Sequence, residues 1–184
     1  QPLEDRNVTI SRAKFTVNYP ASFMLIAAIN PCSCGYFNHP EKDCVCSPGV
    51  VQKYLNKISG PLLDRIDLHV EVTPVNFDEL ASKEDTEGSE TIRERVIEAR
   101  EIQNTRFEKT KDTFANAQMS SKKLKEVCQI SDEGIQLLKT VMDRLGLSAR
   151  AYDLILKVSR TIADLDNAEH IETKHLAEAI QFRS

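Results

Sequence analysis

The first part of the chain alternates between short apolar and polar runs that predict β-structure. Residues 7–18 hold two alternating stretches, the first with Val8 and Ile10 and the second with Phe15, around a short break. This pattern predicts a hairpin or a pair of short strands. The uninterrupted apolar run at 23–29 is typical of a strand buried on both faces of a parallel sheet.

A loop rich in Cys, Gly and Pro follows this predicted strand. The loop spans 31–48, and residues 49–58 then place apolar side chains at helical spacing. Residues 67–72 alternate again and predict a strand whose inward side chains are Leu68, Val70 and Val72. Residues 1–75 are therefore expected to form a partial α/β unit.

The character of the sequence changes after Pro74. A polar, acidic stretch predicts a linker at 76–90, with a brief helix capped by Asn76 at its start. Residues 91–184 carry apolar side chains at helical spacing, which predicts a bundle of helices. The expected fold class is thus α/β, with a partial α/β core followed by an all-α helical bundle.

Capping residues predict where these helices begin and end. Ser120 or Ser121, Ser131 and Ser148 can each cap a helix start, and Gly146 can end a helix in the left-handed conformation. The last helix is expected at 172–182. The first long helix has an apolar stripe of Ile92, Val96, Ala99, Ile102 and Phe107, and a later helix carries Ile135, Leu138, Val141, Met142 and Leu145. The helix after Ser148 is expected to face inward with Tyr152, Ile155, Leu156, Ser159, Ile162 and Ala163.

Composition places the chain among globular proteins, with 41% hydrophobic and 28% charged residues. No window approaches the roughly 18 uninterrupted apolar residues of a membrane helix, so we expect a cytoplasmic protein without a membrane span. The chain opens at Gln1 without an initiating Met, and we therefore expect an excised part of a longer protein.

Charge narrows the expected partners. The net charge of −4 argues against coating of nucleic acid by the whole chain, although local contacts with phosphates stay open. Lys122, Lys123 and Lys125 form a short basic cluster, which is more typical of a solvated helix face than of a binding site.

Four cysteines form two close pairs, Cys32-x-Cys34 and Cys44-x-Cys46, separated by a short turn. Four soft sulfur ligands that converge on one ion suit tetrahedral Zn²⁺, and His39 is a spare ligand. The alternatives are two disulfides, which need an oxidising compartment, or four free thiols. A closed four-ligand site would be structural. The remaining cysteine, at position 128, is most simply a small packed hydrophobic residue.

Three polar residues are candidates for nucleotide chemistry. Asn30 directly follows the predicted buried strand, where α/β sheets place ligand-binding groups. Taken alone, an asparagine here is more typical of a loop residue that satisfies the backbone before Pro31. Arg65 lies between apolar neighbours and could stabilise charge on a phosphoryl group, or pair with a neighbouring aspartate. Arg150 lies in the first turn of a predicted helix, where a cation opposes the helix dipole and an outside anion would compensate it; a nearby carboxylate is the alternative.

These residues stand in motifs that resemble the magnesium-chelatase-like AAA+ ATPases, and the ComM/YifB family in particular. The similarity covers nearly the whole chain, and the motifs occur in the family's order. They are QPLEDRNVTISRA at 1–13, AAINPCSCG at 27–35, SGPLLDRIDLHV at 59–70, LSARAY at 147–152 and RTIADL at 160–165. The paired cysteines match the insertion of the ComM/YifB branch.

The resemblance implies a role for each candidate. It implies that Asn30 is the sensor-1 residue, Arg65 an arginine finger that reaches a neighbouring subunit, and Arg150 the sensor-2 residue. It further implies zinc-type ligands at Cys32, Cys34, Cys44 and Cys46, ATP with Mg²⁺ as cofactor, and a ring-forming homo-oligomer, typically a hexamer. The hairpin resembles the element that MCM helicases project towards DNA, and the helical half resembles the AAA+ lid.

The sequence departs from the family pattern at two points. It contains neither the phosphate loop GxxxxGK[ST] nor the acidic Mg²⁺-binding strand, so we expect ATP hydrolysis of the full-length protein and an inactive fragment. Leu154 stands where family members often carry a basic residue. The resemblance favours a DNA helicase of the branch-migration type; the alternatives are a magnesium-chelatase subunit that assists metal insertion, and a non-enzymatic zinc-knuckle module.

Overall fold

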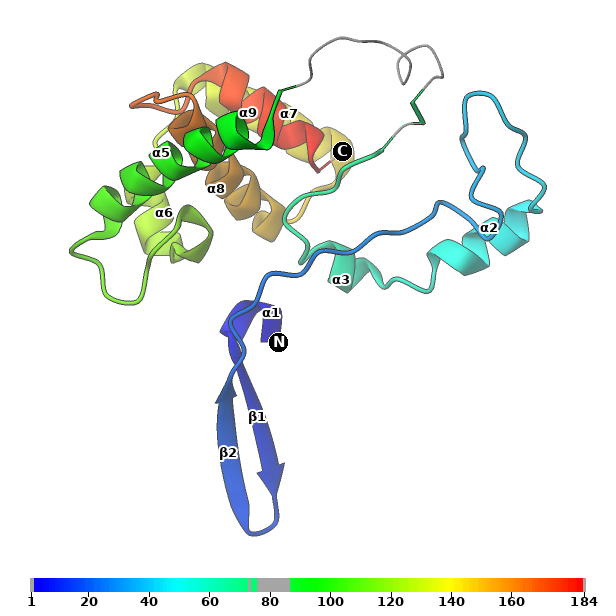
Figure 1. Ribbon diagram of the computed structural model, residues 1–184, viewed down its shortest axis with the longest axis horizontal. Helices are drawn as coiled ribbons and strands as arrows, with labels where there is room; N and C mark the ends of the chain where they lie inside the picture. The colour runs from blue at the N-terminus through cyan, green and yellow to red at the C-terminus, as the bar shows by residue number, and fades with distance from the viewer. Residues whose placement is uncertain (1, 73, 76–86, 184) are drawn as a thin grey trace. The chain divides into compact units, whose positions relative to one another are not determined.

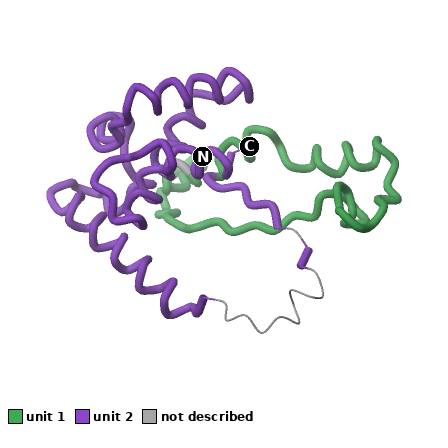
Figure 2. The backbone as a smooth tube through the Cα atoms, turned by 90° about the horizontal axis from the view of Figure 1, so that it is seen from above, with its two compact units in different colours: residues 1–66 green, residues 67–184 purple. Residues whose placement is uncertain are grey.

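A computed structural model describes residues 2–72, 74–75 and 87–183. The chain divides into two compact units, unit 1 at Gln1–Ile66 and unit 2 at Asp67–Ser184 (Figure 2). The predicted linker at 76–90 lies largely outside the described residues, as does the brief helix expected at Asn76.

Unit 1 begins with a short helix and a hairpin (Figure 1). Helix α1 (Pro2–Asp5) leads into β1 (Asn7–Arg12), which pairs antiparallel with β2 (Phe15–Pro20). Arg12 pairs with Phe15, so Ala13 and Lys14 form a two-residue turn. The predicted hairpin is confirmed. Only Val8 and Val17 are half-buried among its strand residues, so neither face of the hairpin covers a core.

The expected buried strand at 23–29 is wrong for this structure. Residues 21–30 join no sheet, and the exposed fractions of Phe23, Met24 and Ile26 are 58%, 82% and 81%. An apolar run becomes a buried strand only when other strands flank it, and in the described residues β1 and β2 make up the one sheet, which is antiparallel.

The strand expected at 67–72 is wrong for the same reason. Residues 67–72 carry no strand pairing, and Val70 and Val72 are 66% and 87% exposed. The part of the chain that the structure describes is therefore mixed α/β through its hairpin and helices, and it does not contain the parallel sheet that the sequence predicted.

Two helices complete the regular structure of unit 1. Helix α2 (Pro48–Leu55) carries Pro48 in its first turn, where proline is well tolerated, and confirms most of the helix expected at 49–58. Helix α3 (Gly60–Leu63) is a single turn that ends at Asp64.

Unit 2 is helical. Three of its helices begin where a serine side chain accepts a backbone N–H group: Ser120 from Lys123, Ser131 from Gly134, and Ser148 from Ala151. Gly146, at φ 61°, ends α7 as predicted. The elements are α5 (Ser89–Phe107), the 3₁₀ turn η1 (Asn116–Gln118), α6 (Ser121–Val127), α7 (Asp132–Leu145), α8 (Ala149–Leu165) and α9 (Thr173–Gln181).

Helix α8 is the centre of unit 2, since α5, η1, α6 and α9 all pack against it. Ile155, Leu156 and Ala163 on α8 are buried together with Leu138 on α7 and Leu176 on α9. Among the described helices, none combines the length and apolar character that crossing a bilayer requires.

Parts of the expected apolar stripes stay outside this core. Ile135 and Leu145 on α7 are 47% and 44% exposed, so the apolar positions of this helix are only partly covered. On α5, Ile92 and Val96 are exposed, whereas the buried residues lie between Ala99 and Phe107. Only the second half of α5 packs on the core, because this helix, about 28 Å long, extends past the packed region.

Candidate functional site

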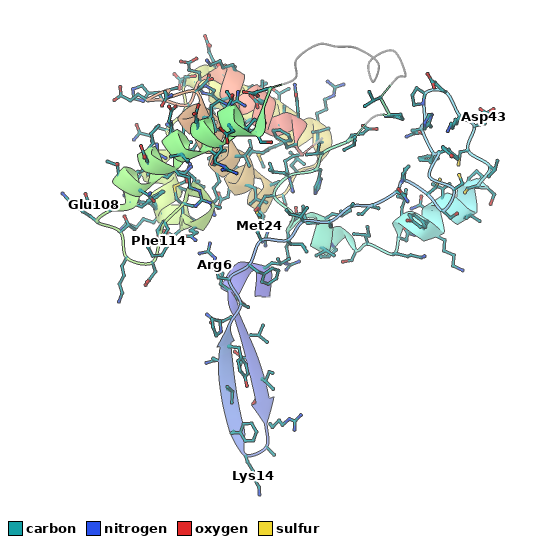
Figure 3. All side chains as sticks on the ribbon, viewed as in Figure 1. Arg6, Lys14, Met24, Asp43, Glu108 and Phe114 are labelled. Carbon is teal, nitrogen blue, oxygen red and sulfur yellow. The ribbon has the colours of Figure 1, made fainter. Side chains whose placement is uncertain are left out.

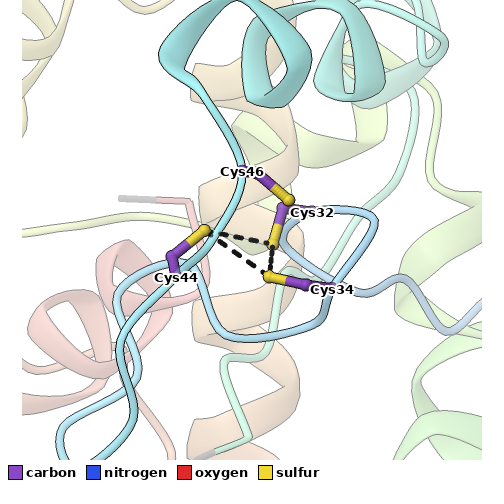
Figure 4. Close-up of side chains that lie close together, drawn as sticks. All are labelled: Cys32, Cys34, Cys44 and Cys46. Atoms are coloured by element: carbon purple, nitrogen blue, oxygen red, sulfur yellow. Dashed lines mark hydrogen bonds between the residues drawn. The ribbon is translucent and has the colours of Figure 1, made fainter.

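The four paired cysteines converge in one place (Figure 4). Cys32 and Cys34 follow the 21–30 segment, and Cys44 and Cys46 directly precede α2. Their Sγ atoms all lie within 4.8 Å of one another. Three of the sulfur–sulfur distances are 3.3, 3.7 and 3.6 Å. A tetrahedral ion with metal–sulfur bonds of about 2.3 Å would separate its ligands by about 3.8 Å, so the four thiols could hold a zinc-sized ion.

Local backbone geometry brings the two pairs together. Gly35, at φ 83°, donates its N–H to the Cys32 carbonyl at 3.1 Å and turns the chain back after the first pair. His39 then fixes the far end of the loop, because its Nδ1 accepts the N–H groups of Glu41 and Lys42 at 3.0 and 3.1 Å. His39 thus braces the loop, and the converging ligand set consists of the four cysteines rather than this histidine.

The environment of the thiols favours a cation. The Tyr36 backbone N–H and the Cys32 thiol lower the pKa of Cys34 to about 6. The Cys46 backbone N–H lowers the pKa of Cys44, but desolvation and the neighbouring Cys34 and Cys32 outweigh it and raise that pKa to about 12. Thiolate character in a crowded cluster of thiols is what a soft divalent cation neutralises, and metal binding would release the remaining protons.

The fifth cysteine has no part in this cluster. Cys128 is 5% exposed within the core of unit 2, and burial raises its pKa to about 11. The prediction of a packed small hydrophobic residue is confirmed. None of the five cysteines is in a disulfide.

Asn30 ends the 21–30 segment with its side chain exposed. It lines a shallow cleft of unit 1, to which α2 and the residues directly after it contribute Tyr54, Lys57 and Ile58. Lys57 Nζ lies over the Tyr54 ring, 5.1 Å from the ring centroid, within the roughly 6 Å of a cation–π contact. The cleft therefore combines an amide and an ammonium group, which suits an anion, while the sensor role of Asn30 stays a prediction.

The two arginines lie at helix ends. Arg65 follows α3, is half-buried and donates from Nη1 to the Pro61 carbonyl at 2.7 Å. Arg150 lies half-buried in the first turn of α8, as predicted from the sequence. Because Asn30 and Arg65 belong to unit 1 and Arg150 to unit 2, their convergence on one nucleotide stays a prediction.

Sequence reasoning missed a buried polar network in unit 2. Asp164 accepts hydrogen bonds from Arg106, Asn116 and Arg160, which come from α5, η1 and α8. Arg160 also donates to the carbonyl groups of Ala168 and Glu169. The network joins three elements and is structural, since its members are satisfied by one another.

Comparison with known proteins matches both halves of the chain. The family described as magnesium chelatase, subunit ChlI, matches residues 1–80, and the family described as its C-terminal part matches residues 86–183. The whole chain is 42% identical to the competence protein ComM of Haemophilus influenzae and 38% identical to the uncharacterized protein YifB of Escherichia coli. It is 35% identical over 182 residues to an uncharacterized protein of Mycobacterium tuberculosis.

The chain covers 35% of the length of each of these relatives. The two family matches together account for nearly all of its residues, and the gap between them, at 81–85, lies within the predicted linker. The chain therefore belongs to the magnesium-chelatase-like family that includes ComM and YifB.

Proposed function

We propose that this chain is the C-terminal part of a AAA+ ATPase that couples ATP hydrolysis to remodelling of DNA, as a branch-migration helicase does. The observation that carries the DNA assignment is the exposed β1–β2 hairpin, with Lys14 at its turn between Arg12 and Phe15 (Figure 3). Phe15 is 59% exposed. Cations that meet phosphates beside an aromatic ring that stacks on bases are the usual components of a nucleic-acid contact.

ATP and Mg²⁺ would bind the full-length protein, and the bound nucleotide supplies the phosphoryl group that is transferred to water. In this chain Asn30 would orient the attacking water or hydrogen-bond the γ-phosphate. Arg65 would place its guanidinium against the phosphates held by a neighbouring subunit, and Arg150 would link the helical unit to them. Such an arrangement requires a ring-forming homo-oligomer, and a hexamer is the expected ring.

Zn²⁺ is the ion that we propose for Cys32, Cys34, Cys44 and Cys46. Their separations fit a tetrahedral thiolate site, and four protein ligands leave no open position for water or substrate. The ion would fix the loop between the 21–30 segment and α2, and so the position of Asn30 relative to Lys57. Its role is structural rather than catalytic.

Mixed oligomers of the full-length protein test the nucleotide roles. Arg65→Ala and Asn30→Ala should each retain ATP binding and lose turnover, whereas Arg144→Ala, at an exposed position of α7, should retain both. If Arg65 acts across a subunit boundary, mixing the two inactive variants creates some sites with both groups intact and restores part of the turnover. Mixtures that stay inactive would remove the finger assignment.

Assistance of metal insertion is the second candidate, because both matching families are described by magnesium chelatase. DNA-stimulated ATPase activity that Lys14→Glu abolishes, with basal turnover unchanged, supports the DNA motor. Stimulation of metal insertion into a porphyrin, without any response to DNA, would instead establish the chelatase role.

A further inference from the structure

Phe114 lies exposed on a braced loop of unit 2. Its exposed fraction is 67%, although burying such a ring would stabilise the fold. The loop is held on both sides of the ring: Thr110 N–H donates to the Phe107 carbonyl at 2.8 Å, and Phe114 N–H donates to Gln118 Oε1 at 2.6 Å. Figure 3 shows Phe114 on this loop, which begins at Glu108. The fold therefore presents the ring in a defined position.

Lysines surround this ring in the sequence. Residues 109–125 contain five lysines and one acidic residue, Asp112, whereas residues 67–184 as a whole contain 17 Lys and Arg against 23 Asp and Glu. The segment is thus a local positive region in an acidic unit. Lys123 pairs with Glu126 at 2.9 Å; the exposed lysines are Lys109, Lys111, Lys122 and Lys125.

The loop and α6 are connected through α8. η1, which ends the loop, and α6, which follows directly, both pack on α8. Lys157 of α8 also donates to the Ala117 carbonyl of η1 at 3.1 Å and fixes that turn. A solvated helix face would explain exposed lysines on α6, but it would not explain an exposed, positioned phenylalanine on the loop that leads into this helix.

We propose that Lys109, Lys111, Phe114, Lys122 and Lys125, named here the Phe114 patch, bind single-stranded nucleic acid. The lysines attract the phosphate backbone, and the ring stacks on an unpaired base. A duplex keeps its bases stacked internally, so it would use the lysines but not the ring. The inference rests on the proposed function, because it takes DNA as the nucleic acid that is bound. It adds a DNA contact in unit 2 to the DNA contact proposed for the hairpin of unit 1.

Binding of a fluorescein-labelled oligo-deoxythymidine to the 184-residue chain, measured by fluorescence anisotropy, tests the patch. Phe114→Ala should weaken binding of the single strand roughly tenfold or more and leave binding of a labelled duplex nearly unchanged. The double variant Lys111→Ala/Lys122→Ala should weaken binding of both the single strand and the duplex. It should also reduce the salt dependence of the binding constant by the equivalent of about two phosphate contacts.

Two control variants separate the patch from other causes. Lys139→Ala removes one exposed lysine from α7 and should bind both DNAs as the unchanged chain does. Phe15→Ala removes the exposed ring of the hairpin. Adding Phe114→Ala to this variant should still weaken binding of the single strand. Circular dichroism should show equal helix content in all variants, because Phe114 lies outside the core.

The inference is overturned if the unchanged chain does not bind the oligonucleotide, or if Phe114→Ala binds it equally well. Either result leaves the proposed function standing, since that function is decided by DNA-stimulated turnover of the full-length protein and its loss in Lys14→Glu. Conversely, oligonucleotide binding could depend on Phe114 while DNA leaves the ATP turnover of the full-length protein unchanged. That outcome would support binding at the Phe114 patch and contradict the proposed DNA-remodelling function.

Discussion

Arg106 on α5 and Asp164 on α8 form a two-point ion pair inside unit 2. Arg106 Nη1 lies 2.7 Å from Asp164 Oδ2, and Nη2 lies 2.5 Å from Oδ1. The same carboxylate accepts from Arg160 Nε at 3.0 Å and from Asn116 Nδ2 at 2.7 Å. Asp164 is 1% exposed. One buried anion therefore compensates two guanidinium groups and ties α5 and η1 to α8.

Removing this anion should destabilise unit 2 strongly. Asp164→Ala leaves Arg160, which is 3% exposed, and Arg106 without their shared counter-charge. Breaking a buried pair in this way costs about 3–5 kcal/mol. The measurement is urea unfolding followed by far-UV circular dichroism, which reports the helices.

Arg95→Ala provides the matched control for that experiment. Arg95 pairs with Glu87 at 2.9 Å, but the two side chains are 52% and 41% exposed. An exposed pair contributes about 0–1 kcal/mol, so this variant should unfold almost as the unchanged chain does. Equal losses in Arg95→Ala and Asp164→Ala would contradict the importance of burial.

The ends of the helices in unit 2 were predictable because their causes are local. A serine side chain that accepts the N–H three residues later, as at Ser131 and Ser148, needs only the neighbouring sequence. The same holds for Gly146. The cysteine cluster was predictable for a related reason, since the pairs are close in the sequence and a short loop joins them.

The Asp164 network and the apolar segment at 23–29 were not predictable in this way. Arg106 and Asp164 are 58 positions apart, and no local pattern relates them. The apolar run predicts burial correctly only if flanking strands are supplied, so its exposure here reflects missing neighbours rather than a different local preference. The exposure of Ile135 and Leu145 was not predictable either, because helical spacing identifies an apolar face of a helix but not how much of that face a neighbouring element covers.

The left-handed cap at Gly146 should be sensitive to substitution. Its φ is 61°, and a Cβ added there would meet nothing within 4 Å. Gly146→Ala should therefore lower the unfolding free energy by about 1–2 kcal/mol through backbone strain alone. Gly146→Asn should lose less, because asparagine tolerates this conformation better. An alanine variant as stable as the unchanged chain would contradict the assigned cap.

Metal content should depend on the four paired cysteines and not on the fifth. We expect about one zinc per chain, its loss in Cys32→Ala and Cys44→Ala, and its retention in Cys128→Ala. Elemental analysis gives the stoichiometry, and the thiolate-to-metal absorption of the Co²⁺-substituted chain reports sulfur ligation. Affinity should fall as pH falls, because the ligands must lose protons. Retention of full metal content by Cys44→Ala would refute the site.

The thiol of Cys128 should be unreactive in the folded chain. Desolvation raises its pKa to about 11, so the neutral thiol predominates at pH 8 and reagents reach it poorly. In the metal-free chain, iodoacetamide should modify the paired cysteines first and Cys128 only after urea unfolding. Because the pKa of Cys128 is raised in the folded chain, its neutral thiol contributes to the stability of unit 2 below the unfolded pKa, near 9. This contribution is lost as pH rises towards 11. Mass spectrometry of the modified peptides checks the order of reaction.

Part of the stability of unit 2 should depend on the ionised carboxylate of Asp166 and be lost at acid pH. Lys174 Nζ lies 2.6 Å from Asp166 Oδ2 and His175 Nε2 lies 3.1 Å from it, and together they lower the pKa of this carboxyl below 3.8. Because His175 Nδ1 accepts the Glu172 N–H at 3.0 Å, the ring carries its proton on Nε2 and donates it to Asp166. A lowered carboxyl pKa contributes stability above the unfolded value, and this contribution is lost as pH falls through the folded value.

Asp166→Asn isolates this contribution. Its urea midpoint should lie below that of the unchanged chain at pH 7, and the gap should close as the pH is lowered past 3.8 towards the folded pKa. Lys174→Ala should show the same closing gap, because it removes the larger cause of the shift. Asp143→Asn removes one carboxylate at an exposed position of α7 and should not reproduce it. The difference in urea midpoint between Asp166→Asn and the unchanged chain could instead stay constant down to the lowest pH. That result would mean that the asparagine acts through the local structure between α8 and α9 and not through the ion pair.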